Sequence, residues 1–440
     1  MPDKELAIPL KSPVERAGSA EVKREILRAA IEEGCLDDTR LLAGFVDIGG
    51  VSETLTSLID AFPKHFRHTF AAKANSMVPA LEIIRAHGLG CEVASPGELH
   101  QALAAGFDPA AIVYDEPAKT REILEFVLER GINFNIDNFQ EFDRVDALVG
   151  SSSPTSKIGF RINPQVGTGT IGAMSTATAT SKFGIALRDD GNRERLIKAY
   201  LNKPWLTTIH THIGSQGCAL ELMVRGIRDV VSLATEINDA GGRIDTIDIG
   251  GGLPVNFDSE DVSPTFADYA EKLAADVPAL FDSTFVVKTE FGRSIFAKRG
   301  FIAARVEYTK NSGGRRIAIA HAGAQTAART AFMPDLWAIR LGVFDRHGVE
   351  RTGDLVEQDV AGPCCFAGDM LARERKLPLI EPGDYIMLHD TGAYYFTNPF
   401  YYNSLPPCAV YGAHWIDRGQ VEFETWREQQ TTADLSRFFG

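Results

Sequence analysis

The runs TIDIGGG (246–252) and FVVKTEFG (285–292) decide the fold of this chain. Each begins with β-branched or aromatic residues, as strands do, and ends in glycine or charged residues. Six earlier runs share this form: HTFAAKA (68–74), GCEVAS (90–95), AIVYD (111–115), NFNID (133–137), KIGFRIN (157–163) and TTIHTHIGS (207–215). Amphipathic stretches such as VPALEIIRAHG and PGELHQALAAGF lie between most of them. Eight strands alternating with helices predict a parallel (β/α)8 barrel of the α/β class, with a doubly wound open sheet as the alternative.

Side chains suited to catalysis lie at the carboxyl ends of these runs. They are Lys73, Glu92, Asp137, Arg161, His212, the glycines 250–252 and Glu290. In a (β/α)8 barrel the catalytic groups gather at this rim. The placement therefore favours the barrel over the open sheet.

The rest of the chain predicts a second domain and two accessory segments. From about residue 300 the runs are strand-like with little helix between them, which indicates a mostly β domain. We predict an N-terminal extension (1–42) that packs on this domain, a barrel (43–298) and the β domain (299–440). The Gly/Thr/Ala/Ser-rich stretch 167–181 predicts a mobile loop over the barrel mouth.

Composition excludes several classes of protein. The 440 residues carry a net charge of −14, which opposes binding to nucleic acid or anionic lipid. No apolar signal core or run of about 18 apolar residues occurs, so we expect a cytoplasmic protein without a membrane partner. Six cysteines in so long a chain are too few for a disulfide scaffold.

Three motifs each have a structural and a chemical interpretation. Lys73 either reaches solvent or forms a Schiff base. Glycines 250–252 either turn the chain or present N–H groups to a phosphate. His210 and His212 share one strand face and either bind a metal or pack on a planar cofactor. No further ligands are supplied, so we predict no metal site. The motif GxxxxGK[ST] does not occur, which argues against a P-loop nucleotide site.

Three motifs later in the sequence also allow more than one interpretation when each is considered alone. Glu290 and Arg293 form either a surface ion pair or a site for a protonated ring nitrogen and a phosphate. Cys365 and Asp369, in GPCCFAGD, lie in the second domain, where most buried cysteines are inert. Tyr394 follows another strand-like run.

Taken together and in order, these motifs resemble the fold-type III pyridoxal-phosphate decarboxylases. The matching motifs are FAAKANS, EVASPGEL, SKFG, HIGSQ, DIGGG, EFGRS, GPCCFAGD, DTGAY and YNS. The chain is most similar to the diaminopimelate decarboxylases and their relatives acting on ornithine and arginine, from about residue 43 to 412. The resemblance implies an alanine racemase-like barrel carrying pyridoxal 5'-phosphate. It also implies an amino-acid substrate and a homodimer in which each β domain completes the partner's site.

The resemblance assigns roles to individual residues. It makes Lys73 the lysine bound to the cofactor aldehyde, and Glu290 the carboxylate that keeps the ring nitrogen protonated. It stacks His212 on the ring, and it makes Cys365 the proton donor lent by the partner subunit. Further cofactor-binding positions are Glu92, Arg161, Ser215, Gly250, Gly251, Gly252, Arg293 and Tyr394. A carboxylate at the ring nitrogen strengthens the electron sink and favours decarboxylation. Alanine racemase has an arginine there.

Departures from the diaminopimelate decarboxylase pattern concern the substrate. The family's Cys-Glu-Ser-Gly-Asp reads CFAGD (365–369), so Phe366 replaces the acid that pairs with a distal ammonium. An unpaired buried ammonium there would be costly. The family's Arg-Pro-Ala-Leu-Tyr reads RTAFM (329–333), which keeps Arg329. Its Asn-Ser-Arg-Pro reads NSLP (403–406), and Glu92 stands where an aspartate is usual.

We therefore expect Arg329, Phe366 and Asp369 to bind the substrate. We predict an amino acid whose far end lacks a free ammonium, in a biosynthetic or secondary-metabolite pathway. The alternatives are a true diaminopimelate decarboxylase of lysine biosynthesis, a racemase of the same fold, and a non-catalytic cofactor binder.

Overall fold

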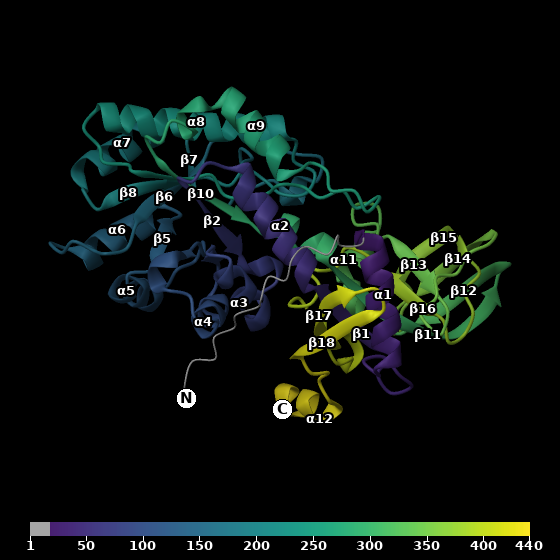
Figure 1. Cartoon of the computed structure of the whole chain (residues 1–440). Coiled ribbons are helices and arrows are strands. Elements are labelled where there is room, and N and C mark those ends of the chain that lie inside the picture. The colour runs from purple at the N-terminus through teal and green to yellow at the C-terminus, as the bar shows by residue number, and fades with distance from the viewer. Residues whose placement is uncertain (1–17) are drawn as a thin grey trace.

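Eight parallel strands close into a barrel, which confirms the predicted fold class (Figure 1). The computed structural model describes residues 18–440. Strand β2 pairs with both β3 and β10, and β5 pairs with β6, so no edge of the ring is left open. In barrel order the strands are β2 (Phe66–Ala71), β3 (Gly90–Val93), β4 (Ile112–Tyr114), β5 (Asn133–Ile136), β6 (Ile158–Asn163), β8 (Leu206–His210), β9 (Thr246–Asp248) and β10 (Val286–Phe291).

Helices alternate with these strands and cover the barrel. Several begin at a residue whose side-chain oxygen accepts a hydrogen bond from a backbone N–H in the first turn, as at Ser95, Thr120, Asn138 and Thr265. The helices are α2 (Ile48–Ala61), α3 (Val78–Ala86), α4 (Pro96–Ala104), α5 (Arg121–Arg130), α6 (Phe139–Val149), α7 (Asn192–Asn202), α8 (Leu220–Asp239) and α9 (Phe266–Asp276). None of the helices within residues 18–440 is long and apolar enough to cross a membrane.

The second sheet forms a mostly β domain beside the barrel (Figure 1). Its strands after the barrel are β11 (Gly300–Ser312), β12 (Arg315–Ala320), β13 (Leu341–Phe344), β14 (Leu355–Ala361), β15 (Met370–Pro378), β16 (Tyr385–Leu388), β17 (Ala409–Asp417) and β18 (Gln420–Arg427). Two helices accompany them, α11 (Ala324–Phe332) and α12 (Thr432–Phe439). The domain is attached to the barrel through α10 (Arg293–Phe296), which directly follows the last barrel strand.

The expected boundary at residue 43 needs a correction. Strand β1 (Leu42–Asp47) lies between β11 and β17 of the second sheet, so it belongs to the β domain and not to the barrel. The ring of Phe45 stacks on Phe301 and Tyr411 at 5.1 and 5.7 Å. The chain thus passes through the β domain before it enters the barrel at α2.

The N-terminal extension contacts the β domain through α1 (Ser19–Glu32). Apolar residues of this helix share a buried cluster with Phe45, Phe301 and Tyr411. Lys23 Nζ lies 2.8 Å from Glu260 and 3.5 Å from Asp390, and so joins a barrel loop to the β domain. Residues 1–17 of the predicted extension lie outside the described residues.

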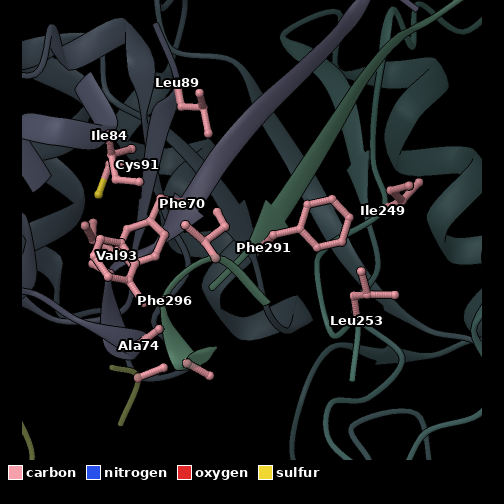
Figure 2. Close-up of a cluster of buried hydrophobic side chains, with 14 of the residues drawn as sticks. Phe70, Ala74, Ile84, Leu89, Cys91, Val93, Ile249, Leu253, Phe291 and Phe296 are labelled. Carbon is pink, nitrogen blue, oxygen red and sulfur yellow. The ribbon is translucent and has the colours of Figure 1, made fainter. Parts of the chain in front are cut away.

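The two domains share a hydrophobic core at the junction of β2, β10 and α10. Figure 2 shows Phe70 and Phe296 within this cluster, and their ring centroids lie 5.1 Å apart. Backbone contacts reinforce the junction, since Tyr394 N–H donates to the Ala74 carbonyl at 2.7 Å. The β domain therefore meets the barrel at the rim where catalytic groups were expected.

Candidate active site

A cavity of about 450 Å³ lies at the carboxyl ends of the barrel strands. Its lining includes ten of the residues singled out from the sequence: Lys73, Glu92, Arg161, His212, Ser215, Gly252, Glu290, Arg293, Arg329 and Tyr394. The last two come from the β domain, so one chain builds the cavity from both domains. Ala173, Met174 and Thr176 of the loop 167–181 also line it, which places this loop at the mouth, while its mobility stays a prediction.

Lys73 forms an ion pair deep in this cavity. It lies just beyond β2, and its Nζ is 2.9 Å from Oε2 of Glu92, at the end of β3. The Lys73 side chain is 41% exposed because it faces the cavity, whereas that of Glu92 is 1% exposed. Burial lowers the pKa of Lys73, but Glu92, Tyr394 and Glu290 outweigh it and raise that pKa above its usual value. The lysine is thus held as an ammonium until its charge partners are rearranged.

A row of buried titratable side chains extends from Arg161 to Glu290. Arg161 Nη1 lies 2.9 Å from Asp115 Oδ2, and His210 stands between the carboxylates of Asp115 and Glu290 at 3.7 and 3.5 Å. Burial, together with Glu92 and Asp115, raises the pKa of Glu290 well above its usual value. Glu290 Oε1 has no hydrogen-bond partner within residues 18–440. Glu290 can therefore share a proton with a basic ring nitrogen placed against it.

Asp115 was not among the expected site residues, and His210 was considered only as a metal ligand or a residue packed on a planar cofactor. Asp115 ends a strand-like run, which was the signal that could have identified it. Burial raises the pKa of Asp115, but Arg161 and His210 lower it below its usual value. Asp137, another strand-end residue, lies outside the cavity lining, and its carboxylate accepts the Gly184 N–H at 2.9 Å.

Asp115, His210 and Glu290 also offer ligand atoms within 4.8 Å of one another, the spacing of a candidate metal centre. Arg161 already holds Asp115, and its guanidinium would repel a cation. The three groups therefore form a buried electrostatic cluster rather than a metal centre.

The glycines after β9 make room for a close backbone approach. Gly252 has φ +96°, and a Cβ there would lie 1.9 Å from the Gly214 carbonyl oxygen. Gly251 N–H donates to His212 Nδ1 at 3.2 Å, which fixes the imidazole beside this turn. Gly250 and Gly251 thus lie behind the lining and support it.

Arg293 and Tyr394 lie beside this turn in the cavity. The Arg293 guanidinium lies 4.4 Å from the Tyr394 ring centroid, and its Nε has no hydrogen-bond partner within residues 18–440. Tyr394 has φ +66°, an uncommon backbone conformation for a residue with a side chain. A buried guanidinium without a carboxylate, next to a glycine turn, is suited to a phosphate.

Arg329 lies on α11 in a box of aromatic rings. Its guanidinium carbon is 4.5 Å from the Trp337 ring centroid, 5.0 Å from Tyr395 and 5.4 Å from Tyr394. No carboxylate within residues 18–440 pairs with it, and Nη2 donates only a long bond of 3.4 Å to the Tyr394 carbonyl. Trp337 and Tyr395 had no sequence signal. The rings thus position the Arg329 guanidinium so that it can bind an anionic group.

The segment 362–369, here called the motif loop, lies outside the cavity. Cys365 is exposed, and its N–H donates to Asn403 Oδ1 at 2.6 Å. Phe366 stacks on Phe332 with centroids 5.3 Å apart and meets Tyr402 at 4.9 Å. The structure therefore does not bring Cys365 or Phe366 to Lys73 of the same chain.

The expectation that Asp369 binds substrate is not supported. Asp369 is buried, and its two oxygens accept the N–H groups of Ala324 and Cys364, each at 2.6 Å. With both oxygens occupied, this carboxylate joins the motif loop to the start of α11. Its role is structural.

Comparisons with known proteins decide the family of this site. A family model described as "Pyridoxal-dependent decarboxylase, pyridoxal binding domain" matches residues 49–297. The chain belongs to the pyridoxal-dependent decarboxylases. A diaminopimelate decarboxylase of Archaeoglobus fulgidus is 30% identical over 394 residues, covering 86% of this chain and 88% of that protein. One from Pseudomonas aeruginosa is 33% identical over 336 residues, covering 76% and 78%.

Solved structures agree with this assignment. The crystal structure of diaminopimelate decarboxylase from Helicobacter pylori complexed with L-lysine has a TM-score of 0.80 at 25% identity. The match covers 93% of this chain and 98% of that chain. The predicted fold-type III decarboxylase family, the enzyme class and the pyridoxal phosphate cofactor are thereby confirmed.

The cavity fits pyridoxal phosphate on its own chemistry. Lys73 supplies an amine for the aldehyde, the unpartnered Glu290 oxygen suits the ring nitrogen, and Arg293 with the glycine turn suits the phosphate. His212 lines the cavity and can cover one ring face. Which residue contacts which part of the cofactor remains a prediction. The residue types that the cofactor requires are all present in this one cavity.

Proposed function

We propose that the protein removes the α-carboxylate of an amino acid whose far end is anionic or uncharged. The observation that carries this proposal is the charge arrangement of the cavity. Arg329 has no carboxylate partner within residues 18–440, whereas each carboxylate lining the cavity already lies within 4 Å of a basic group. A distal ammonium would find no free counter-ion and would meet Arg329, at a cost in desolvation and repulsion.

The residues divide the chemistry between them. When bound, pyridoxal phosphate supplies a sink for the electron pair that loss of CO2 leaves at Cα. Lys73 would hold the cofactor through its aldehyde carbon and would release it to the substrate amine. Glu290 would keep a proton at the ring nitrogen, because the resulting ring cation would supply the counter-charge for this buried carboxylate, whose Oε1 has no hydrogen-bond partner within residues 18–440. Arg293 would bind the phosphate, and Arg329 would orient the far end of the substrate.

The proton that replaces CO2 needs a donor, and we assign this role to Cys365 of a second copy. Cys365 is exposed and is not part of the cavity lining of its own chain. Cys364 beside it is buried, and burial raises the pKa of its thiol to about 11. A homodimer with two composite sites would place the exposed thiol where it can act. Phe366 would then lie at the distal end of the partner's substrate.

Two other activities compete with this proposal. The relatives reported above are named diaminopimelate decarboxylases, which favours meso-diaminopimelate as the substrate. A racemase of the same fold would return the proton to Cα without releasing CO2. Glu290 argues against the racemase, because a carboxylic group at the ring nitrogen strengthens the electron sink.

The test is a single incubation series in deuterated water. Purified holoenzyme receives amino acids with a distal carboxylate, amide or acylated amine, and meso-diaminopimelate, while CO2 and deuterium at Cα are measured. We expect CO2 release from a member of the first group, with one deuterium in each amine product. Deuterium exchange without CO2 would establish the racemase, and preferred turnover of meso-diaminopimelate would overturn the substrate proposal.

A further inference from the structure

A second cavity, of about 480 Å³, lies at the opposite end of the barrel from the active site. Its walls include the beginnings of β2 and β3, the turn before β4, and Lys288 on β10. In a parallel barrel these amino-terminal strand ends form one rim. We call this space the basal cavity. Its volume lies within the range of small-molecule sites.

Every charged group that lines the basal cavity is cationic. Lys64, Arg67 and Lys288 contribute full charges, and His68 and His87 add two imidazoles, while no carboxylate takes part in the lining. This composition is opposite to that of the whole chain, in which Asp and Glu outnumber Lys and Arg by 59 to 45. A local excess of this kind concentrates anions.

The three cations are also unpartnered. Within residues 18–440 no ion pair or side-chain hydrogen bond is made by Lys64, Arg67 or Lys288, whereas nearby Lys157 is paired with Asp245 at 2.5 Å. Lys288 is half-buried, so its ammonium cannot be fully hydrated. Burial, together with Lys157, lowers its pKa, although Asp248, Glu290 and Asp245 oppose the shift. A bound anion would supply the missing counter-charge.

The remaining walls are apolar and define the rest of the ligand. Ile59, Phe62, Phe66, Leu89 and Ala111 line the same space. His68 contributes little charge at neutral pH, because burial lowers its pKa to about 4, and its Nδ1 is hydrogen-bonded to Thr289 Oγ1 at 2.8 Å. The geometry points to a binding site for a small organic anion, a carboxylate or phosphate ester with an apolar body and without an amine. An amino acid is disfavoured because its ammonium would face Lys64, Arg67 and Lys288.

The site can be tested on the holoenzyme by calorimetric titration with three matched probes. Hexanoate has the proposed chemistry, hexanamide removes the charge, and inorganic phosphate lacks the apolar body. We expect hexanoate to bind once per chain, more tightly than phosphate, and hexanamide not to bind. Equal binding of hexanoate and hexanamide would contradict the proposal.

Variants locate the binding. Lys288→Met is expected to weaken hexanoate binding about tenfold, because a charge-assisted contact is lost. The exposed Arg67→Gln tests the same rim if Lys288→Met fails to fold, and it should also weaken binding. Lys157→Met is the matched control and Arg329→Met removes the active-site cation; both should bind hexanoate as the wild type does. Loss of binding in Arg329→Met with retention in Lys288→Met and Arg67→Gln would place the anion in the active site and overturn the proposal.

Discussion

The active-site cavity and the motif loop differ in the side chains that they present. In the cavity, buried charges are arranged against one another, as Lys73 with Glu92 and Arg161 with Asp115. The motif loop is aromatic and partly exposed, with Phe366 stacked on Phe332 and Cys365 facing outward. The residues proposed to hold the cofactor thus line one cavity of one chain, whereas the roles proposed for Cys365 and Phe366 require a second copy.

We therefore expect the cavity residues to govern the reaction itself and the motif-loop residues to govern the choice of substrate. Substitutions in the cavity should abolish the chemistry of every substrate. Substitutions in the motif loop should act across an interface and change the ranking of substrates. Each prediction below tests one side of this division.

The largest effect is expected from Lys73→Ala. Without the amine the cofactor has no covalent anchor, so activity should fall by an order of 10⁴-fold or more. Absorbance spectroscopy of the purified protein should show loss of the protein-bound cofactor band. Lys157→Ala is the matched control, because Lys157 lies outside the cavity and pairs with Asp245. Retention of both activity and the band in Lys73→Ala would refute the assignment.

Glu290→Gln should cost about 10²–10³-fold in kcat with a smaller change in KM, since it removes a preorganised charge interaction at the ring nitrogen. Steady-state CO2 release measures both constants. The exposed Glu194→Gln on α7 controls for the loss of a carboxylate elsewhere on the barrel. A normal kcat in Glu290→Gln would mean that another group protonates the ring.

Cys365→Ala should reduce product formation about 10²-fold, the lower range for removal of a general acid. Mixing inactive Lys73→Ala with Cys365→Ala tests the composite site. Random reassociation gives half heterodimers, each with one intact site, so about a quarter of wild-type activity should return. Cys364→Ala should stay active. Failure of the mixture to regain activity after verified subunit exchange would confine the site to one chain.

The barrel was predictable because its signals are local. Eight β-rich runs with polar ends determined the fold and identified several charged residues of the cavity, including Lys73 and Glu290. Strands β14 and β15 have exposed, charged residues that interrupt the apolar alternation that marks a strand, so the sequence gives only a weak signal for them. Strand β1 was assigned to the wrong domain, because its partners β11 and β17 are remote in sequence.

The contacts made by the motif loop could not be predicted from the sequence. The pattern singled out Cys365 and Phe366, whose proposed roles remain predictions, and the two oxygens of Asp369 could accept hydrogen bonds from either a substrate or the backbone. Only the structure shows that they accept the Ala324 and Cys364 N–H groups. The aromatic box around Arg329 likewise arises from residues distant along the chain.

Phe366→Glu should raise kcat/KM for meso-diaminopimelate about tenfold, because a carboxylate at this position can pair with the distal ammonium. The same change should lower kcat/KM for a substrate with a distal carboxylate. Phe366→Leu is the control, since it keeps an apolar residue and should leave the ranking of substrates unchanged. An unaltered ranking in Phe366→Glu would remove the motif loop from substrate recognition.

The smallest effect concerns stability and Asp248, which ends β9. Burial and nearby Glu290 raise its pKa to about 7. Because the folded-state pKa of Asp248 lies above its usual value near 4, the protonated group contributes to the stability of the folded state, and this contribution is complete below about pH 4. The contribution is lost as pH rises through about 7. Asp248→Asn removes this titration while keeping an acceptor for Gly250 N–H. Urea unfolding should therefore show the variant gaining stability relative to wild type as pH rises, by up to about 1.4 kcal/mol per unit. A difference that is independent of pH would contradict the assignment.

One competition assay tests the central claim most directly. Wild-type holoenzyme is given equal concentrations of meso-diaminopimelate and its analogue acylated on the distal amine, and the two decarboxylated products are quantified at low conversion. The ratio of products equals the ratio of kcat/KM values. The account predicts excess product from the acylated analogue, because the cavity offers no free counter-ion for a distal ammonium. Excess product from free meso-diaminopimelate would contradict it.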